Sequence, residues 1–299
     1  MSRAYIMAFI TVIVWGTAFT AIRASLHGGY SPGHLMLLRH VIASAAFILY
    51  AMWPGVKFKL PKRQDLLKIL ILGWIGISVY HLGVGYGEVT ISAGTAGLLI
   101  GSSPIFTAII AVIFSKERLD RNGWVGLFIG FVGIALITVG SSGSSFEIST
   151  GALLLIMAAI ATSIYFVFQK PLFKRYSPIE VTAYVTWAGT LPFFFYMPGI
   201  IDTIQQATLE ANLSVIFLGI FPSAIGYVTW TIALSLGKAS SISSILYIEP
   251  IIAIIVSWLW LQEVPSSLAL LGGMISILGV LVVNGLIKRK KKKPVSIVT

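Results

Sequence analysis

The uncharged stretch at residues 93–114 reads AGTAGLLIGSSPIFTAIIAVIF. A helix of about 20 apolar residues is long enough to cross the roughly 30 Å hydrocarbon core of a bilayer. In lipid only helices and closed barrels satisfy every backbone hydrogen-bonding group. The stretch is too long and too uniformly apolar for the roughly ten-residue alternating strands of a barrel. It therefore predicts a transmembrane helix.

Similar stretches recur along the whole chain, which is 57% hydrophobic and only 10% charged. Soluble domains average about 25% charged residues. The ten expected spans are residues 4–22, 34–53, 68–87, 93–114, 122–140, 150–169, 180–197, 212–236, 240–261 and 267–287. The pattern predicts an all-α integral membrane protein. The absence of cysteine excludes disulfides, thiolate catalysis and cysteine metal sites.

The positions of the 21 Lys and Arg residues predict the topology. With the N-terminus in the cytoplasm, ten spans return the C-terminus there, and every basic residue except Arg23 and Arg39 falls in a cytoplasmic segment. We therefore expect a multi-pass protein of the cell (inner) membrane with both termini cytoplasmic. The first span, flanked only by Arg3, is read as a retained helix. The basic tail, residues 288–299, is expected to contact anionic lipid, and nucleic acid is not an expected partner.

A constant shift of 146 residues aligns polar and glycine landmarks in the two halves of the chain. The matched pairs are Ser31 with Ser177, Pro32 with Pro178, Gly73 with Gly219, Pro104 with Pro250, Glu117 with Glu263, Gly126 with Gly272 and Gly133 with Gly279. We expect a five-helix repeat at residues 1–142 and a second at residues 149–287. Because five is odd, the second repeat must enter the membrane from the opposite side. Such inverted repeats are typical of secondary transporters that bind substrate near the bilayer midplane and work by alternating access.

Several of these stretches resemble the EamA family of the drug/metabolite transporter superfamily. VWGTAF at residues 14–19 is similar to that family's tryptophan–glycine signature. The stretch from SPIF at 103–106 to KERL at 116–119 resembles its repeat signature, which recurs from Glu249 onward. The resemblance implies a probable exporter of amino acids or other small metabolites. Trp15 and Gly16 have no counterpart at Ala161 and Thr162, so the two halves are not equivalent in function.

Glu249 is the foremost candidate for a substrate-binding residue. An ionisable side chain at the centre of a span costs about 2.5–3.5 kcal/mol on the insertion scale. Glu249 lies within the expected ninth span, directly before Pro250. It could bind a substrate ammonium group or a coupling proton; alternatively, it is a neutral glutamic acid hydrogen-bonded to Ser or Tyr. Pro250 and its counterpart Pro104 are expected to bend their helices.

Other polar residues within the spans are weaker candidates. His81 could titrate near neutral pH or bind a carboxylate, or it could be a packed neutral histidine. Arg39, a few residues from the end of its span, could attract a carboxylate, but the preferred interpretation is that it reaches water by snorkelling. Glu117 and Glu263 could latch the two gates, although the preferred interpretation is that both are polar helix ends near water.

Aromatic side chains within the spans could supply cavity walls with apolar faces and polar tips. The candidates, each also explicable as helix packing, are Trp15, Tyr80, Tyr86, Tyr165, Trp187, Tyr227, Trp230 and Tyr247.

Two other functional classes compete with a carrier. An intramembrane enzyme would need a nucleophile with a base, or a set of metal ligands, and none of the familiar motifs occurs. A channel would need a filter-like run, and none is evident. No catalytic residue, metal site or cofactor is expected. The expected partners are a small-molecule substrate, membrane lipids and, if transport is coupled, protons. Ten spans could enclose a cavity in a monomer, and the oligomeric state stays open.

Overall fold

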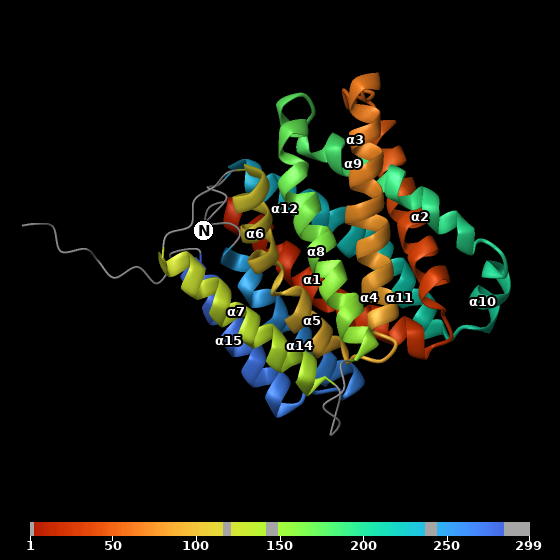
Figure 1. Cartoon of the computed structure of the whole chain (residues 1–299). Coiled ribbons are helices and arrows are strands. Elements are labelled where there is room, and N and C mark those ends of the chain that lie inside the picture. Colours follow the sequence, from red (N-terminus) through yellow and green to blue (C-terminus); the bar gives the residue numbers. More distant parts are fainter. Residues whose placement is uncertain (1–2, 116–120, 142–148, 237–243, 284–299) are drawn as a thin grey trace, which may run out of the picture.

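The computed structural model describes residues 3–115, 121–141, 149–236 and 244–283, and all regular structure in these ranges is helical (Figure 1). The first half contains α1 (Arg3–His27), α2 (Pro32–Ala51), α3 (Arg63–Gly73), η1 (Trp74–Val79), α4 (Tyr80–Gly87), α5 (Ala93–Ile100), α6 (Ser103–Ser115) and α7 (Arg121–Gly140). The second half contains α8 (Thr150–Phe168), η2 (Lys170–Lys174), α9 (Pro178–Thr190), η3 (Leu191–Tyr196), α10 (Ile200–Gln206), α11 (Leu209–Ile220), η4 (Phe221–Gly226), α12 (Tyr227–Leu236), η5 (Ser244–Ile248), α14 (Glu249–Leu261) and α15 (Ser267–Val283).

Seven helical segments in the described ranges are long and apolar enough to cross a membrane. They are Arg3–His27, Pro32–Ala51, Arg63–Gly87, Ala93–Phe114, Arg121–Gly140, Thr150–Lys174 and Leu209–Ala233. The apolar helices α14 and α15 are shorter, with 13 and 17 residues. α9 continues into the 3-10 turn η3.

Equivalent helices in the two halves begin in the same way. The Ser31 hydroxyl accepts a hydrogen bond from the His34 amide at the start of α2, and Pro32 is the first helical residue. At the start of α9 the Ser177 hydroxyl accepts one from the Glu180 amide. The Glu180 carboxylate in turn accepts one from the Ser177 amide, which completes a capping box. The Ser-Pro pairs therefore form N-caps in both halves, as expected for serine followed by proline.

The helices are also interrupted at equivalent places. π-Helical turns join α3 to α4 and α11 to α12, at Trp74–Val79 and Phe221–Gly226. The segments containing Pro104 and Pro250 are broken as well, because α6 starts at Ser103 and α14 starts at Glu249. Each of these prolines therefore lies in the first turn of a helix instead of bending a continuous one. The missing N–H of proline costs nothing there, because the first amides of a helix have no intrahelical partner.

The last helices of the two halves, α7 and α15, run side by side at one edge of the molecule (Figure 1). Glycines allow this close approach: a Cβ atom at Gly133 would lie 2.4 Å from the Ser276 amide nitrogen, and one at Gly126 would lie 2.6 Å from that of Val283. Gly133 follows Gly126 in α7, whereas Ser276 precedes Val283 in α15, so the two helices are antiparallel.

The middle of the molecule brings the halves together. α1 packs against α12 and α14, while α8 packs against the corresponding α4 and α6. The hydroxyls of Ser44 in α2 and Thr190 in α9 hydrogen-bond at 3.0 Å, and these residues are 146 positions apart. A cavity lies between the halves.

Candidate functional site

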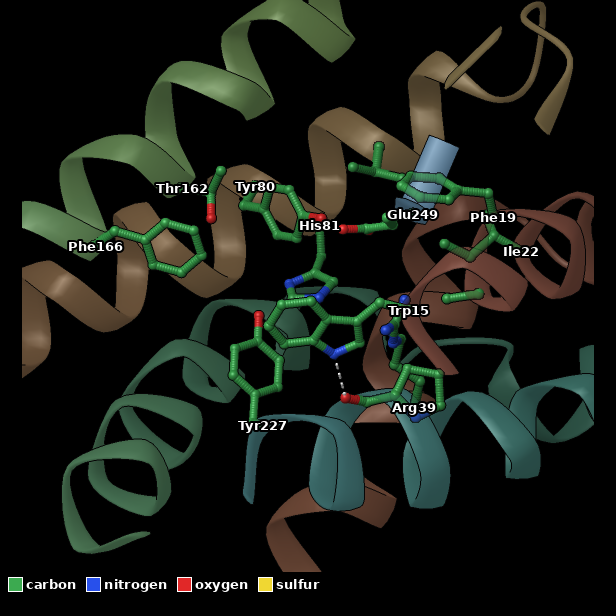
Figure 2. Close-up of a pocket in the computed structure, with 13 residues that line it drawn as sticks. Trp15, Phe19, Ile22, Arg39, Tyr80, His81, Thr162, Phe166, Tyr227 and Glu249 are labelled. Carbon is green, nitrogen blue, oxygen red and sulfur yellow. Dashed lines mark hydrogen bonds between the residues drawn. The ribbon is translucent and has the colours of Figure 1, made fainter. Parts of the chain in front are cut away.

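The central cavity takes its walls from both halves of the chain (Figure 2). It is lined by Trp15, Ala18, Phe19, Ile22, Arg39, Tyr80, His81, Val84, Thr162, Phe166, Pro222, Tyr227 and Glu249. A neighbouring space shares five of these residues and reaches the break between α5 and α6 at Gly101, Ser103 and Pro104. The cavity thus meets both interrupted helices.

Glu249 enters the cavity as the first residue of α14. α1 lies directly against this helix start, since a Cβ atom at Gly16 would be 3.0 Å from the Glu249 carbonyl oxygen. The helix dipole favours an acidic side chain in the first turn. No hydroxyl among the described side chains donates to this carboxylate, so the alternative of a hydrogen bond to Ser or Tyr is not seen in this part of the chain. The carboxylate can therefore interact with a ligand.

Arg39 supplies a positive charge to the same cavity. The expectation that it snorkels to water is wrong: the residue is only 3% exposed, and its Nε donates to the Ser223 hydroxyl at 2.9 Å. The reason is that α11 covers α2 closely, with Gly219 against the Arg39 carbonyl. The side chain is thereby confined beside the π-helical turn η4, which presents Ser223.

Aromatic rings form much of the wall. Trp15 is held in place by donating its indole N–H to the Pro222 carbonyl at 3.1 Å (Figure 2). Its ring meets Tyr227 edge-on at a centroid distance of 5.2 Å, and Trp230 lies 5.7 Å away. Such rings provide rigid apolar contact area for a ligand side chain.

Two histidines lie together beside the cavity. The His81 ring lines it, and the His40 ring packs against His81 at a centroid distance of 4.2 Å. Each Nδ1 is within 2.9 Å of a backbone carbonyl, His81 with Ile77 and His40 with Met36. Because a carbonyl only accepts, each Nδ1 carries a proton and donates it to that carbonyl. The His81 ring thus contributes to the cavity wall.

The structure brings together five of the ten residues expected to bind substrate: Trp15, Tyr80, His81, Tyr227 and Glu249. The others lie elsewhere: Trp230 contacts Trp15, Tyr165 is buried against Gly76, Tyr86 is 41% exposed, Trp187 donates to the Ser44 carbonyl, and the side chain of Tyr247 is outside the described part. Phe19, Ile22, Thr162 and Phe166 were not anticipated. Thr162 stands 146 residues after Gly16 of the tryptophan–glycine pair, so the repeat itself pointed to it.

One end of α1 carries a further charged contact. Arg23, next to the cavity residue Ile22, forms an ion pair with Glu263 at 3.0 Å. Glu263, expected to be a polar helix end near water, lies just after α14 and is paired with a basic residue. Its counterpart Glu117 lies outside the described residues.

Comparison with known proteins gives consistent matches along the chain. The profile described as "EamA-like transporter family" matches residues 2–139 and again residues 149–285. The chain is 38% identical to the uncharacterized transporter YdfC of Bacillus subtilis, with 89% of this chain and 86% of the relative covered. It is 36% identical to a probable terminal-alkyne amino-acid exporter of Streptantibioticus cattleyicolor, over 95% and 94% of the two chains. A solved crystal structure with 21% identity superposes with a TM-score of 0.65 over 96% of this chain and 98% of that one, a likeness of fold.

Proposed function

Because this chain belongs to the EamA-like transporter family, we propose that it is a secondary carrier that exports small amino-acid-like metabolites by alternating access. It is a multi-pass membrane transporter, as its relatives and its long apolar helices indicate. We propose the class of substrate, the mechanism of transport and the direction of transport.

The observation that carries the proposal is a cavity with an acidic and a basic side chain from opposite halves. Glu249 comes from the second half and Arg39 from the first. Charges in a low-dielectric site are costly unless they are paired. A zwitterionic substrate offers an ammonium group to the carboxylate and a carboxylate to the guanidinium. The rings of Trp15, Phe166 and Tyr227 then contact an apolar substrate side chain.

Alternating access would follow from ten spans arranged as two inverted five-helix repeats. Three features support this arrangement: the π-helical turns and helix breaks recur at equivalent places, α7 and α15 are antiparallel, and Ser44 contacts Thr190. Interrupted helices around a midplane site are typical of such carriers. Exchange of the two repeat conformations would expose Glu249 and Arg39 first to one side and then to the other.

The direction and the location complete the proposal. One relative is named a probable amino-acid exporter, which supports export here. The distribution of Lys and Arg supports an inner-membrane protein with both termini in the cytoplasm.

Counterflow in proteoliposomes tests the proposal. The panel contains apolar amino acids, their N-acetyl derivatives without the ammonium group, their amides without the carboxylate, and nucleosides and organic cations. We expect saturable counterflow of the intact amino acids and weak exchange of both derivatives. Preferred exchange of nucleosides or organic cations would overturn the substrate class. A flux that does not saturate would indicate a channel instead of a carrier.

A further inference from the structure

A charged cluster joins three segments at one end of the cavity. Arg23 of α1 pairs through Nε with Glu263, and its Nη1 donates to the backbone carbonyls of Glu88 and Val89. Glu263 also accepts a hydrogen bond from the Ala93 amide at the start of α5. One guanidinium therefore ties α1 to the end of α4 and to the segment after α14. In this arrangement the ends of these helices are held together.

The carboxyl group of Glu88 is the unexplained member of the cluster. Glu88 is 0% exposed, and neither carboxyl oxygen has a hydrogen-bond partner, although Arg23 binds the backbone carbonyl of the same residue. A buried carboxylate without a donor costs several kcal/mol, whereas a protonated carboxyl costs much less. The observed arrangement is therefore stable only when Glu88 carries a proton.

The charges around Glu88 set up a competition for one arginine. Of the described groups, Arg23 of α1, Arg39 of α2, Glu263 after α14 and the phenol of Tyr80 on α4 interact electrostatically with it. Arg39 already bonds to Ser223 in the cavity wall. Arg23, a long side chain 15% exposed, is the cation that touches both acidic residues. It cannot fully neutralise both at once.

We infer that the Glu88 carboxyl is a proton-binding site that controls a gate made by Arg23 and Glu263. With the proton bound, Arg23 remains on Glu263 and this end is closed. When the proton leaves to water, the new carboxylate draws the guanidinium away from Glu263. α1 is then released from the segment after α14, and the cavity opens at this end.

The gate fits an exporter with the proposed orientation, and that part of the inference rests on the proposed function. Arg23 lies in the segment expected outside, so the open state would take up an external proton at Glu88 and close. A two-state contact biased by one proton is sufficient for such a switch.

The test uses the absence of cysteine from the chain. Ala18→Cys places a single thiol in the cavity wall. A membrane-impermeant maleimide is added to right-side-out and to inside-out vesicles across a pH series. The alkylation rate is measured for Ala18→Cys alone and combined with Glu88→Gln, which imitates the protonated state, or with Glu263→Gln, which removes the acid of the latch. Asp202→Asn, an exposed acid at the same end, is the matched control.

Dividing each rate by that of the Glu88→Gln protein at the same pH cancels the titration of the thiol itself. When the maleimide is added from one particular face of the membrane, we expect the ratio for Ala18→Cys to stay near one at acid pH. As the pH increases, the ratio should rise by up to about tenfold per pH unit, the limit for one proton. From the other face it should stay near one. At every pH, the protein with Ala18→Cys and Glu263→Gln should be alkylated faster than the protein with Ala18→Cys and Glu88→Gln. Adding Asp202→Asn to Ala18→Cys should leave the alkylation rate of Ala18→Cys unchanged at each pH.

A ratio near one across the whole pH series from both faces would overturn the proton site. Equal rates for Glu263→Gln and Glu88→Gln would overturn the latch. Size-exclusion profiles and melting temperatures verify folding, and Glu88→Ala replaces Glu88→Gln if that variant does not fold. Because alkylation needs no substrate, failure of this inference is distinguishable from failure of the counterflow experiment.

Discussion

At the scale of single residues, replacing either of the two charged residues in the cavity should affect the transport of different substrate analogues. Glu249→Gln removes the partner of the ammonium group and leaves the guanidinium in place. A hydrogen bond to a charged group contributes about 1.5–3 kcal/mol, so counterflow of amino acids should fall about 10- to 100-fold. N-acetyl derivatives, which lack the ammonium group, should be affected little. Unchanged amino-acid transport by Glu249→Gln would remove this residue from the site.

Arg39→Gln should show the reverse preference. Amino acids and N-acetyl derivatives lose the partner of their carboxylate, whereas amides, which lack that carboxylate, should exchange at nearly the unmodified rate. Competition of each analogue against a labelled amino acid measures this preference. If amides and acids lose equally, Arg39 has a packing role through Ser223 and does not bind substrate.

The candidate site could be predicted from the sequence only in part. Glu249 and His81 were expected because they are ionisable residues within spans, and Trp15 because an aromatic ring can form a cavity wall; all three line the cavity. Arg39 was misjudged because distance along its helix indicated access to water, while α11 covers that face. Tyr86 and Trp187 lie outside the cavity lining. The face that a residue presents depends on which helices pack around it, and residue type alone does not give this.

At the scale of helices, the contact between α7 and α15 depends on small residues. A Cβ atom at Gly133 would lie 2.4 Å from backbone, the Ser276 nitrogen, so Gly133→Ala must separate the helices. Gly85→Ala is the matched control, because the one tight contact of its Cβ atom would be with the flexible Met36 Cε at 2.8 Å, and its next contact, with Pro32 Cβ at 3.4 Å, is of ordinary length. We expect Gly133→Ala to lower the free energy of unfolding by about 1–3 kcal/mol. Its melting temperature in detergent should therefore fall clearly more than that of Gly85→Ala. Equal melting temperatures would contradict the contact.

Helix positions were easier to predict than helix interruptions. The expected spans beginning at 34 and 180 start within two residues of α2 and α9, where the Ser-Pro pairs form the caps. The π-helical turns at Trp74–Val79 and Phe221–Gly226 were not predicted, since nothing in the local hydropathy distinguishes them from α-helix. The prolines at 104 and 250 marked the right places but were expected to bend helices that are in fact broken there.

At the scale of the whole molecule, the family was predicted from VWGTAF and the repeat signatures, and the profile matches in both halves confirm it. The topology is a prediction that the absence of cysteine makes simple to test. Leu60 lies after the end of α2 and is 82% exposed, whereas Asp202 lies near the beginning of α2; each is replaced by cysteine in turn. An impermeant maleimide should label only Asp202→Cys in right-side-out vesicles and only Leu60→Cys in inside-out vesicles. The opposite result would invert the expected orientation.

The hydrogen bond between Ser44 and Thr190 has a consequence for the origin of the chain. In a symmetric homodimer, a residue can touch its own copy only near the twofold axis. Ser44 and Thr190 are related by the 146-residue shift, so their contact is the one that such an axis inside one polypeptide would produce if the two halves are inverted repeats. This is the geometry expected if a gene for a five-helix subunit was duplicated and fused after its product had already formed antiparallel pairs. The serine and the threonine would then descend from one ancestral residue that once bonded to itself.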